Sequence, residues 1–324
     1  MDFLILNRQY DRLLSHNIED YPEGIVIPID KPYRWTSADV IRKIKFTAIR
    51  HFGKKNLKVG HAGTLDPLAT GVLLVCIGKA TKMAETLQSH DKEYEAGITF
   101  GATTPSYDLE KEIDRFFPHE KVSRESIEAA LPGFIGEQDQ IAPLFSAKSV
   151  DGVRAYELAR KLYKEGGSID EAAAELIRTA RINISELELL SFEPSACRTA
   201  DKIGSRTAYG NEDPDRTGNG GCSGDGSTNG SGDGSTSDNG AGGGSYTNAS
   251  SRINVTDNSS LGLPRAVIRM ACSKGTYVRA FARDLGEALD SGAHLDSLRR
   301  TRSGIFRASE SLSIDEAINI LAAD

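Results

Sequence analysis

A long stretch that is poor in apolar residues interrupts this chain and sets the first limit on its fold. From residue 210 to residue 244, 13 of 35 residues are glycine, and most of the others are Ser, Thr, Asn or Asp. Such a composition buries too little apolar surface to offset the entropy lost on ordering. We therefore predict a flexible, low-complexity insertion over residues 199–262. Residues 1–198 and 263–324 must supply the core, and we predict that they form one domain.

The two parts that flank this insertion mix helices and strands without regular βαβ alternation. Residues 36–53 carry apolar side chains every three or four positions, which predicts a helix that Thr36 or Ser37 caps and Gly53 ends. The alternation from Lys92 to Thr103 predicts a half-buried strand. Other predicted elements are strands at 176–193 and 264–272, a helix near 123–131, and a C-terminal helix opened by a capping box at Ser313–Glu316. This mixture predicts an α+β domain.

Several classes of protein are disfavoured by what the sequence lacks. No apolar run approaches the roughly 20 residues that cross a bilayer, and the first residues do not form a signal peptide. The four cysteines are far apart, which favours neither a disulfide framework nor a zinc site. Gly78-Lys79 lacks the earlier glycine of a nucleotide-binding loop. We expect a cytoplasmic monomer that needs no metal or organic cofactor.

The net charge of −7 argues mildly against a nucleic-acid-binding protein. Between residues 200 and 262, however, eight acidic and four basic residues account for −4 of that total, which leaves −3 for the rest. Local basic patches therefore matter more than the sum. Two patches stand out, although a solvated helix face is an open alternative for the first: the stretch Arg42–Lys55, and the run Arg299, Arg300, Arg302 and Arg307.

The densest candidate for chemistry is Gly60–Leu74, where glycines lie on both sides of one aspartate, Asp66. Glycines allow sharp turns and close approach of another molecule. Pro67 favours an extended conformation for the residue before it, which would present Asp66 in a loop. The apolar run Val72–Ile77 then supplies a buried strand or helix that anchors this loop. An Asp before Pro is by itself most often a turn residue, so Asp66 is a candidate here and no more.

The stretch Gly60–Lys82 resembles the signature of the TruB family of tRNA pseudouridine synthases. It has the core Gly-His-x-Gly-Thr-Leu-Asp-Pro and the ending Gly-x-Ala-Thr-Lys. Four other segments resemble motifs of the same family in the same order: Asp30–Ser37, Gln140–Arg160, Cys272–Arg279 and Leu295–Phe306. The resemblance covers about residues 22–195 and 263–306. Chance is a poor explanation for five ordered matches.

This resemblance implies a fold and an activity. The fold would be that of a pseudouridine synthase, with a mixed, largely antiparallel central sheet, flanking helices and an RNA-gripping loop. The activity would be that of an isomerase. A uridine at position 55, in the T-arm loop of tRNA, is flipped out, its base detaches, rotates and rejoins through carbon 5. The family needs no cofactor, no membrane and no obligate protein partner for this reaction.

The resemblance also implies the catalytic residues. Asp66 matches the essential aspartate, and either attack on C1′ or removal of a proton from C2′ is open to it. Arg279 matches the arginine that pairs with this aspartate; a guanidinium within hydrogen-bonding range keeps a carboxylate ionised and oriented. A surface phosphate contact is the alternative for Arg279. Tyr94 matches the tyrosine that stacks on the flipped base, and Tyr277 the one beside the base edge.

Substrate-binding roles follow in the same way. Leu298 matches an apolar residue of the pocket, and His61 a histidine that helps to hold the RNA loop open. The remaining substrate-binding residues predicted by the resemblance are Lys92 and Lys148. Asp108 stands where the family has an acidic residue, and we interpret it as a supporting carboxylate.

The chain departs from the family pattern in several places. Ala142 and Phe145 stand where Pro and Tyr are commoner in the RNA-gripping loop. Only 18 residues follow Phe306, too few for the small RNA-binding PUA domain that many members carry at the C-terminus. Affinity is then expected to come from the basic patches, so that charge reversal of Lys54, Lys55 and Arg300 weakens tRNA binding. We expect the insertion to be dispensable, so that a short linker can replace residues 205–258.

Three other hypotheses compete with this one. A module that binds tRNA without chemistry would not need Asp66 and Arg279 together. A hydrolase could use Asp66 and Asp108 as paired carboxylates, but a carboxylate paired with arginine is a poor general acid. The same chemistry could also act on another RNA or within a guide-RNA complex. The first reading fits the whole set of motifs best.

Overall fold

The computed structural model describes residues 3–146, 148–150, 152–167, 169–177, 179–195 and 253–323. Most of the predicted insertion, residues 199–252, lies outside the described residues. Its last ten residues, 253–262, are described and contact the rest of the domain.

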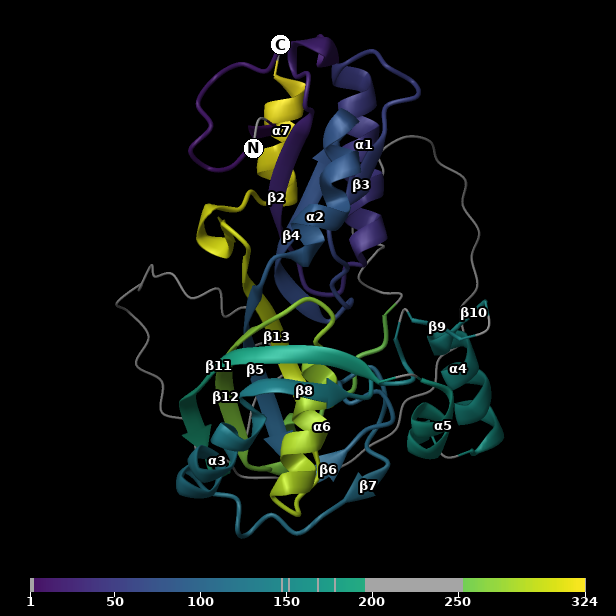
Figure 1. The fold of residues 1–324 in the computed structure, drawn as a ribbon, viewed down its shortest axis with the longest axis vertical. Coiled ribbons are helices and arrows are strands. Elements are labelled where there is room, and N and C mark those ends of the chain that lie inside the picture. Colours follow the sequence, from purple (N-terminus) through teal and green to yellow (C-terminus); the bar gives the residue numbers. More distant parts are fainter. Residues whose placement is uncertain are drawn as a thin grey trace, which may run out of the picture.

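A ten-stranded sheet forms the backbone of the molecule, with the strand order β1-β2-β4-β13-β5-β12-β11-β8 (Figure 1). Strand β3 pairs with β4, and β14 pairs with β13. In this sheet only the β1–β2 and β4–β13 pairings are parallel, which confirms the predicted mixed, largely antiparallel sheet. The strands are β1 (Leu4–Ile5), β2 (Ile25–Lys31), β3 (Val59–His61), β4 (Ala69–Ile77), β5 (Lys92–Phe100), β8 (Gly136–Gln140), β11 (Ala180–Glu193), β12 (Arg265–Cys272), β13 (Ala293–Ser303) and β14 (Phe306–Arg307).

The helices cover the sheet in two groups and confirm the α+β class. Helices α1, α2 and α7 lie with β2, β3 and β4 in the half that holds both termini, whereas α3 and α6 lie with β5, β8, β11 and β12 (Figure 1). Helices α4 and α5 stand to one side, next to the small β9–β10 ladder (Figure 1). A second small ladder pairs β6 with β7. Among the described residues, no helix combines the length and apolar character needed to cross a membrane.

The bounds of these elements are α1 (Ser37–His51), α2 (Ala84–Ser89), α3 (Arg124–Ala130), α4 (Ala155–Glu165), α5 (Ile169–Leu176), α6 (Val278–Ala288), α7 (Ile314–Ala322), β6 (Ala102–Thr103), β7 (Arg115–Phe116), β9 (Ser149–Val150) and β10 (Val153–Arg154).

Helix α1 follows the sequence signals closely. The Thr36 side chain accepts a hydrogen bond from the backbone N–H of Asp39, whose carboxylate accepts one from the N–H of Thr36. This capping box satisfies two of the donors that a helix N-terminus leaves unpaired. Val40 and Ile44 are fully buried, and Gly53 has the positive φ of +59° that ends many helices. The predicted capping box at Ser313 likewise begins α7.

The long strand β13 connects the two halves of the molecule. It pairs with β5 over most of its length, but with β4 only where Leu298–Arg300 lie against Ala69–Gly71. Gly71 has φ +97°, and a side chain there would collide with the backbone of Arg300. Glycine is therefore required for this close approach. The loop that carries Asp66 comes just before this short pairing, so it lies at the junction of the two halves.

Candidate functional site

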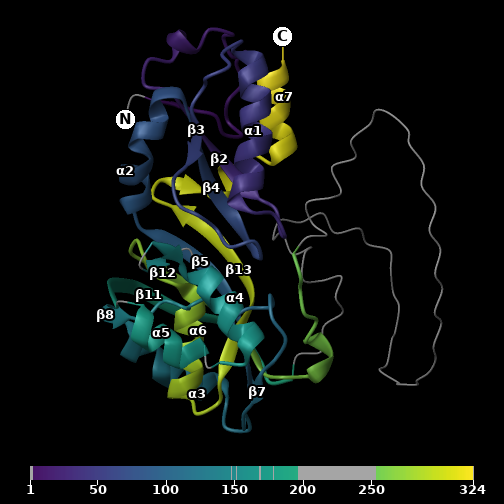
Figure 2. The ribbon, with the colours of Figure 1, turned by 90° about the vertical axis from the view of Figure 1, so that its right-hand side faces the viewer.

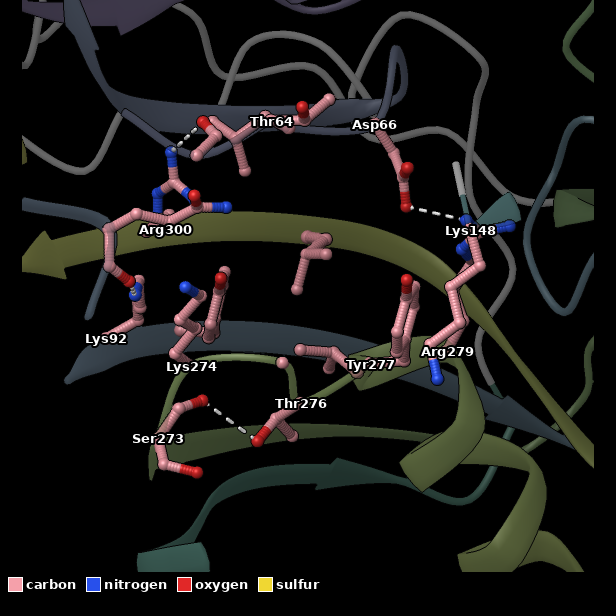
Figure 3. A pocket seen from close by; sticks show the side chains of 17 residues that line it. Thr64, Asp66, Lys92, Lys148, Ser273, Lys274, Thr276, Tyr277, Arg279 and Arg300 are labelled. Atoms are coloured by element: carbon pink, nitrogen blue, oxygen red, sulfur yellow. Dashed lines mark hydrogen bonds and ion pairs between the residues drawn. The ribbon is translucent and has the colours of Figure 1, made fainter. Parts of the chain in front are cut away.

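A cavity of about 300 Å³ opens at this junction. All but one of the eight predicted catalytic and substrate-binding residues line it, from the Asp66 loop, β5, the segment before β9, the start of α6 and β13 (Figure 3). Among the described residues, the lining is Gly63, Thr64, Leu65, Asp66, Gln88, Lys92, Tyr94, Lys148, Ser273, Lys274, Gly275, Thr276, Tyr277, Val278, Arg279, Leu298 and Arg300. Five segments that are distant in the sequence thus form one site.

The centre of the site is an ion pair between Asp66 and Arg279, with 2.9 Å between Oδ2 and Nη2 (Figure 3). The Asp66 side chain is 40% exposed, whereas that of Arg279 is 6% exposed. A molecule in the cavity can therefore reach the carboxylate, while the guanidinium holds it from behind. Burial alone would lower the pKa of Arg279, but Asp66, Asp108 and Glu110 raise it. The ion pair fixes the direction in which the Asp66 carboxylate points.

Asp108 lies on the other side of Arg279. Its Oδ2 is 3.5 Å from Nη1 of Arg279, and its Oδ1 accepts hydrogen bonds from the Ser106 hydroxyl and the Glu110 N–H. Nη1 of Arg279 also donates to the Ser106 carbonyl at 3.1 Å. Burial raises the pKa of Asp108, and Arg279 opposes that effect. The guanidinium lies between the two carboxylates, and the supporting role predicted for Asp108 stays a prediction.

The segment Asp30–Ser37 holds the Asp66 loop in place. The Ser37 hydroxyl donates to the Leu65 carbonyl and accepts from the Leu65 N–H. The fully buried Lys31 donates from Nζ to the carbonyls of Pro67, Pro32 and Trp35, at 3.2, 3.0 and 2.6 Å. Burial lowers the pKa of Lys31 to about 7, and Asp66 opposes that effect. Both residues that flank Asp66 are thus tied to the N-terminal half.

Lys31→Met is expected to lower the free energy of unfolding by about 1–3 kcal/mol at pH 8, because buried carbonyls lose their donor. The folded pKa of about 7 lies below the ordinary 10.5, so the unfolded chain binds a proton that the folded chain has released. The advantage of wild type over the variant should therefore grow between pH 7 and 9, by at most about 1.4 kcal/mol per pH unit.

Urea unfolding of both proteins across that pH range measures the difference. Lys121→Met, at an exposed lysine, is the control and should change stability by less than about 0.5 kcal/mol. An advantage that shrinks as the pH rises would contradict the burial of Lys31.

The two predicted tyrosines contribute their rings from different elements. Tyr94 lies on β5 and is 9% exposed, and Tyr277 is the N-cap residue of α6. The Gln140 side chain accepts from the N–H of Tyr277 and donates to its carbonyl, at 2.8 and 3.2 Å. Gln140 therefore fixes the turn that leads into Arg279. Burial raises the pKa of both tyrosines, so both phenols stay neutral at physiological pH.

Several cationic side chains line the cavity. Lys92 is buried and donates to the carbonyls of Gln88 and His90, and burial lowers its pKa to about 8. Lys148 lies over the Tyr277 ring, with Nζ 5.9 Å from the ring centroid. Lys274 is exposed and completes the lining. This distribution suits a ligand with negative charge near the cavity mouth.

The predicted basic surface comprised Arg299, Arg300, Arg302 and Arg307. It is wrong for Arg300, and only Arg307 of the four is exposed. Arg300 is 2% exposed, and it donates to the carbonyls of Val72 and Gly63 at 2.7 and 3.3 Å. Arg299 makes a two-point ion pair with Asp30, and Arg302 lies 3.9 Å from Glu93. These guanidiniums link β13 to its neighbours. Arg300 is instead a cavity residue that the sequence reading missed.

The two-residue repeat of side chains along a strand could have predicted Arg300 as a cavity residue. Side chains two positions apart on a strand point to the same face. Leu298 was assigned to the pocket, so Arg300, two residues later in an uninterrupted part of β13, belongs to the same face.

His61 is the one predicted site residue that does not line the cavity. It is half-buried on β3, and its Nδ1 is buried without a hydrogen-bond partner in the described part of the chain. Burial lowers the pKa of His61, with Arg300 adding to that effect. The predicted contact of His61 with RNA stays a prediction.

The two departures in the expected RNA-gripping loop have a structural explanation. Ala142 and Phe145 are 1% and 5% exposed and belong to a small apolar cluster with Ala155 and Ala159 of α4 and Ala173 of α5. Both residues therefore serve as a local core between this loop and the two helices beside it.

Comparison with known proteins gives consistent matches. The family model for the N-terminal domain of TruB family pseudouridylate synthases matches residues 50–205, and that for the C-terminal domain of tRNA pseudouridylate synthase B matches residues 279–322. The tRNA pseudouridine synthase B of Phocaeicola vulgatus is 42% identical over 296 residues, which cover 91% of this chain and 92% of that protein. The protein of the same name from Flavobacterium johnsoniae is 36% identical over 297 residues, covering 91% and 95%.

Among solved structures, a Cbf5–Nop10–Gar1 complex is similar to this chain at 23% identity and a TM-score of 0.48, over 90% of this chain and 52% of that one. The matches to curated proteins extend along most of both sequences, and they agree with the motifs that form the cavity. We conclude that the chain belongs to the TruB family of pseudouridine synthases.

Proposed function

We propose that this protein converts the uridine at position 55, in the T-arm loop of tRNA, to pseudouridine. It acts as a cytoplasmic monomer without a cofactor. The observation that carries this proposal is the ion pair of Asp66 and Arg279 at the wall of a cavity lined by Tyr94 and Tyr277. Relatives that are 36–42% identical are named tRNA pseudouridine synthase B.

The chemistry assigns each group a role. A uridine that leaves its stack loses stacking energy, and an aromatic ring can restore part of it. Tyr94 and Tyr277 supply such rings, and Leu298 supplies apolar contact. Asp66, held in place by Arg279, acts on the ribose so that the glycosidic bond breaks. The enclosed base can then rotate and bond to C1′ through carbon 5. Carbon 5 loses its proton and N1 gains one, so that the overall composition does not change.

The test of the target is a set of tRNA transcripts that differ at one nucleotide. The unmodified transcript should gain one pseudouridine at position 55, and a transcript with cytidine there should gain none. An isolated T-arm stem-loop should also be modified. Pseudouridine at another position would contradict the proposed target but not the proposed reaction. Tight tRNA binding without product would favour a protein that binds tRNA without chemistry.

A second concave surface supports binding of the tRNA body. A groove of about 530 Å³, which we call the lysine groove, lies beside β3. The described residues that line it include no Asp or Glu; they are Lys45, Lys55, Asn56, Leu57, Lys58, Val59, Gly60 and Thr81. The three lysines are exposed, whereas Lys54 is paired with Glu19 at 2.7 Å. Strand β3 leads from this groove to the Asp66 loop. An RNA whose uridine lies in the cavity can therefore place phosphates in the groove.

Charge reversal of Lys45, Lys55 and Lys58 to Glu is expected to weaken tRNA binding about 10- to 100-fold near 0.1 M salt. Each lost phosphate contact lowers the slope of log Kd against log salt by about 0.7–0.9. Fluorescence anisotropy over a salt series measures both. Reversal of Arg115 and Lys121, exposed near α3, is the control and should leave the slope unchanged. An unchanged slope in the triple variant would contradict a role of the lysine groove.

A further inference from the structure

The described end of the predicted insertion forms a segment that we call the strap, residues 253–264. Figure 2 shows it running along the side of the molecule from the base of α1 towards β12. Three backbone groups tie it to the domain. The Ile253 carbonyl accepts from Nη2 of Arg34 at 2.7 Å, the Thr256 N–H donates to the Leu109 carbonyl at 2.8 Å, and the Pro264 carbonyl accepts from Phe100.

The first of these hydrogen bonds, between Ile253 and Arg34, connects the strap to the Asp66 loop. The backbone N–H of Arg34 donates to the Pro67 carbonyl at 3.0 Å, next to Asp66. Arg34 has φ +62°, a left-handed conformation that residues other than glycine rarely adopt. Such a conformation persists only when the surroundings hold it in place. The hydrogen bond to Ile253 fixes the Arg34 side chain, and with it the backbone that holds Pro67.

The second hydrogen bond, from Thr256 to Leu109, connects the strap to the Arg279 side of the Asp66–Arg279 ion pair. Leu109, whose carbonyl accepts from Thr256, directly follows Asp108. Asp108 contacts Arg279, and Arg279 contacts Asp66. Leu109 also lines a small cavity together with Asp66 and Arg279. The strap therefore bonds directly to the neighbour of Asp108 and reaches the neighbour of Asp66 through Arg34.

We propose that the strap and Arg34 position the catalytic ion pair. Arg34 and the strap touch no reacting atom; they set the place of Asp66 through Pro67 and that of Arg279 through Asp108. Displacement of a reacting group by about 1 Å can cost up to about 10²-fold in rate, so loss of these ties should slow the chemical step. The activity part of this inference rests on the proposed function.

Arg34→Gly separates positioning from stability, because glycine tolerates the left-handed conformation. We expect an unchanged or higher Tm, a Kd for tRNA within about two-fold of wild type, and a single-turnover rate lower by about 10-fold. Asp290→Gly is the matched control, since Asp290 is an exposed residue with φ +51° after α6. This control should show a similar change in Tm, and its single-turnover rate should equal that of wild type.

Two replacements by a Gly/Ser linker show which part of the insertion the reaction needs. Replacing residues 205–251 keeps the strap and should keep the wild-type rate. Replacing 205–258 removes the Ile253 and Thr256 hydrogen bonds and should lower the rate about 10-fold or more, which revises the expectation from the sequence that this whole span is dispensable. In the second background Arg34→Gly should have no further effect, because its partner is already gone. Equal rates for the two replacements, or a full additional loss from Arg34→Gly, would overturn the proposal.

Amide hydrogen exchange provides a readout that needs no product. Peptides covering residues 62–70 should exchange faster in Arg34→Gly and in the 205–258 replacement than in wild type, and at the wild-type rate in Asp290→Gly. Unchanged exchange in both strap variants would overturn the proposal even if wild type made no pseudouridine. If the variants show this exchange pattern but the wild-type protein makes no pseudouridine, the proposed function is contradicted and the positioning by the strap is not.

Discussion

Asp66→Asn is expected to lower the single-turnover rate of pseudouridine formation by at least about 10³-fold, with the Kd for tRNA within about two-fold of wild type. Asparagine has nearly the same shape as aspartate but can neither attack a carbon nor accept a proton at neutral pH. The ion pair with Arg279 becomes a weaker hydrogen bond, while the cavity keeps its lining. Rapid mixing of excess enzyme with labelled tRNA gives the rate directly.

Asp108→Asn is the control for this substitution. Asp108 is a buried carboxylate that contacts Arg279 on the side away from Asp66, so it acts through that arginine. We expect a loss of about 10-fold. Equal losses for the two variants would contradict a direct role of Asp66 in the reaction.

Arg279→Met is expected to have the second largest effect, on activity and on stability together. The rate should fall at least about 10²-fold, since Asp66 loses the group that orients it. The free energy of unfolding should fall by about 3–5 kcal/mol, because the buried Asp108 carboxylate loses its cation. Burial already raises the pKa of Asp108, and removal of Arg279 raises it further.

The pH dependence of this variant has a definite sign. A raised folded pKa means that the folded state of the variant holds a proton that the unfolded chain releases. The stability of Arg279→Met relative to wild type should therefore improve as the pH falls from 7 to 5. Urea unfolding at both values measures this. Arg269→Met, which removes an exposed ion pair with Glu188, should cost under about 1 kcal/mol at either pH. No pH-dependent difference for Arg279→Met would contradict the burial of Asp108.

Local signals in the sequence predicted local structure well. Thr36, Ser123 and Ser313 each begin a helix with a capping box, because the cap and its partner lie three residues apart in the chain. The run Val72–Ile77 left strand and helix open, since a continuous apolar run fits either when both sides are buried. In the structure it is strand β4, with β2 along one edge and with β13 and β3 along the other.

Site residues that belong to a motif were predicted, and those that depend on three-dimensional contacts were not. Asp66 and Arg279 came from the family resemblance, and the structure brings them together across more than 200 positions of the chain. Arg300 was taken for a surface residue because composition does not distinguish an exposed guanidinium from one that bonds buried carbonyls. The contact of Arg34 with Ile253 spans 219 positions, and no local pattern marks either residue.

The measurement that tests this account most directly is pseudouridine mapping on an unmodified tRNA transcript, with wild type beside Asp66→Asn. The account predicts one pseudouridine in the T-arm loop with wild type and none with the variant, while both proteins bind the transcript with similar affinity. Equal product from the two proteins would contradict the role of Asp66. No product from either, with tight binding by both, would contradict the assignment of the protein as a tRNA-modifying isomerase.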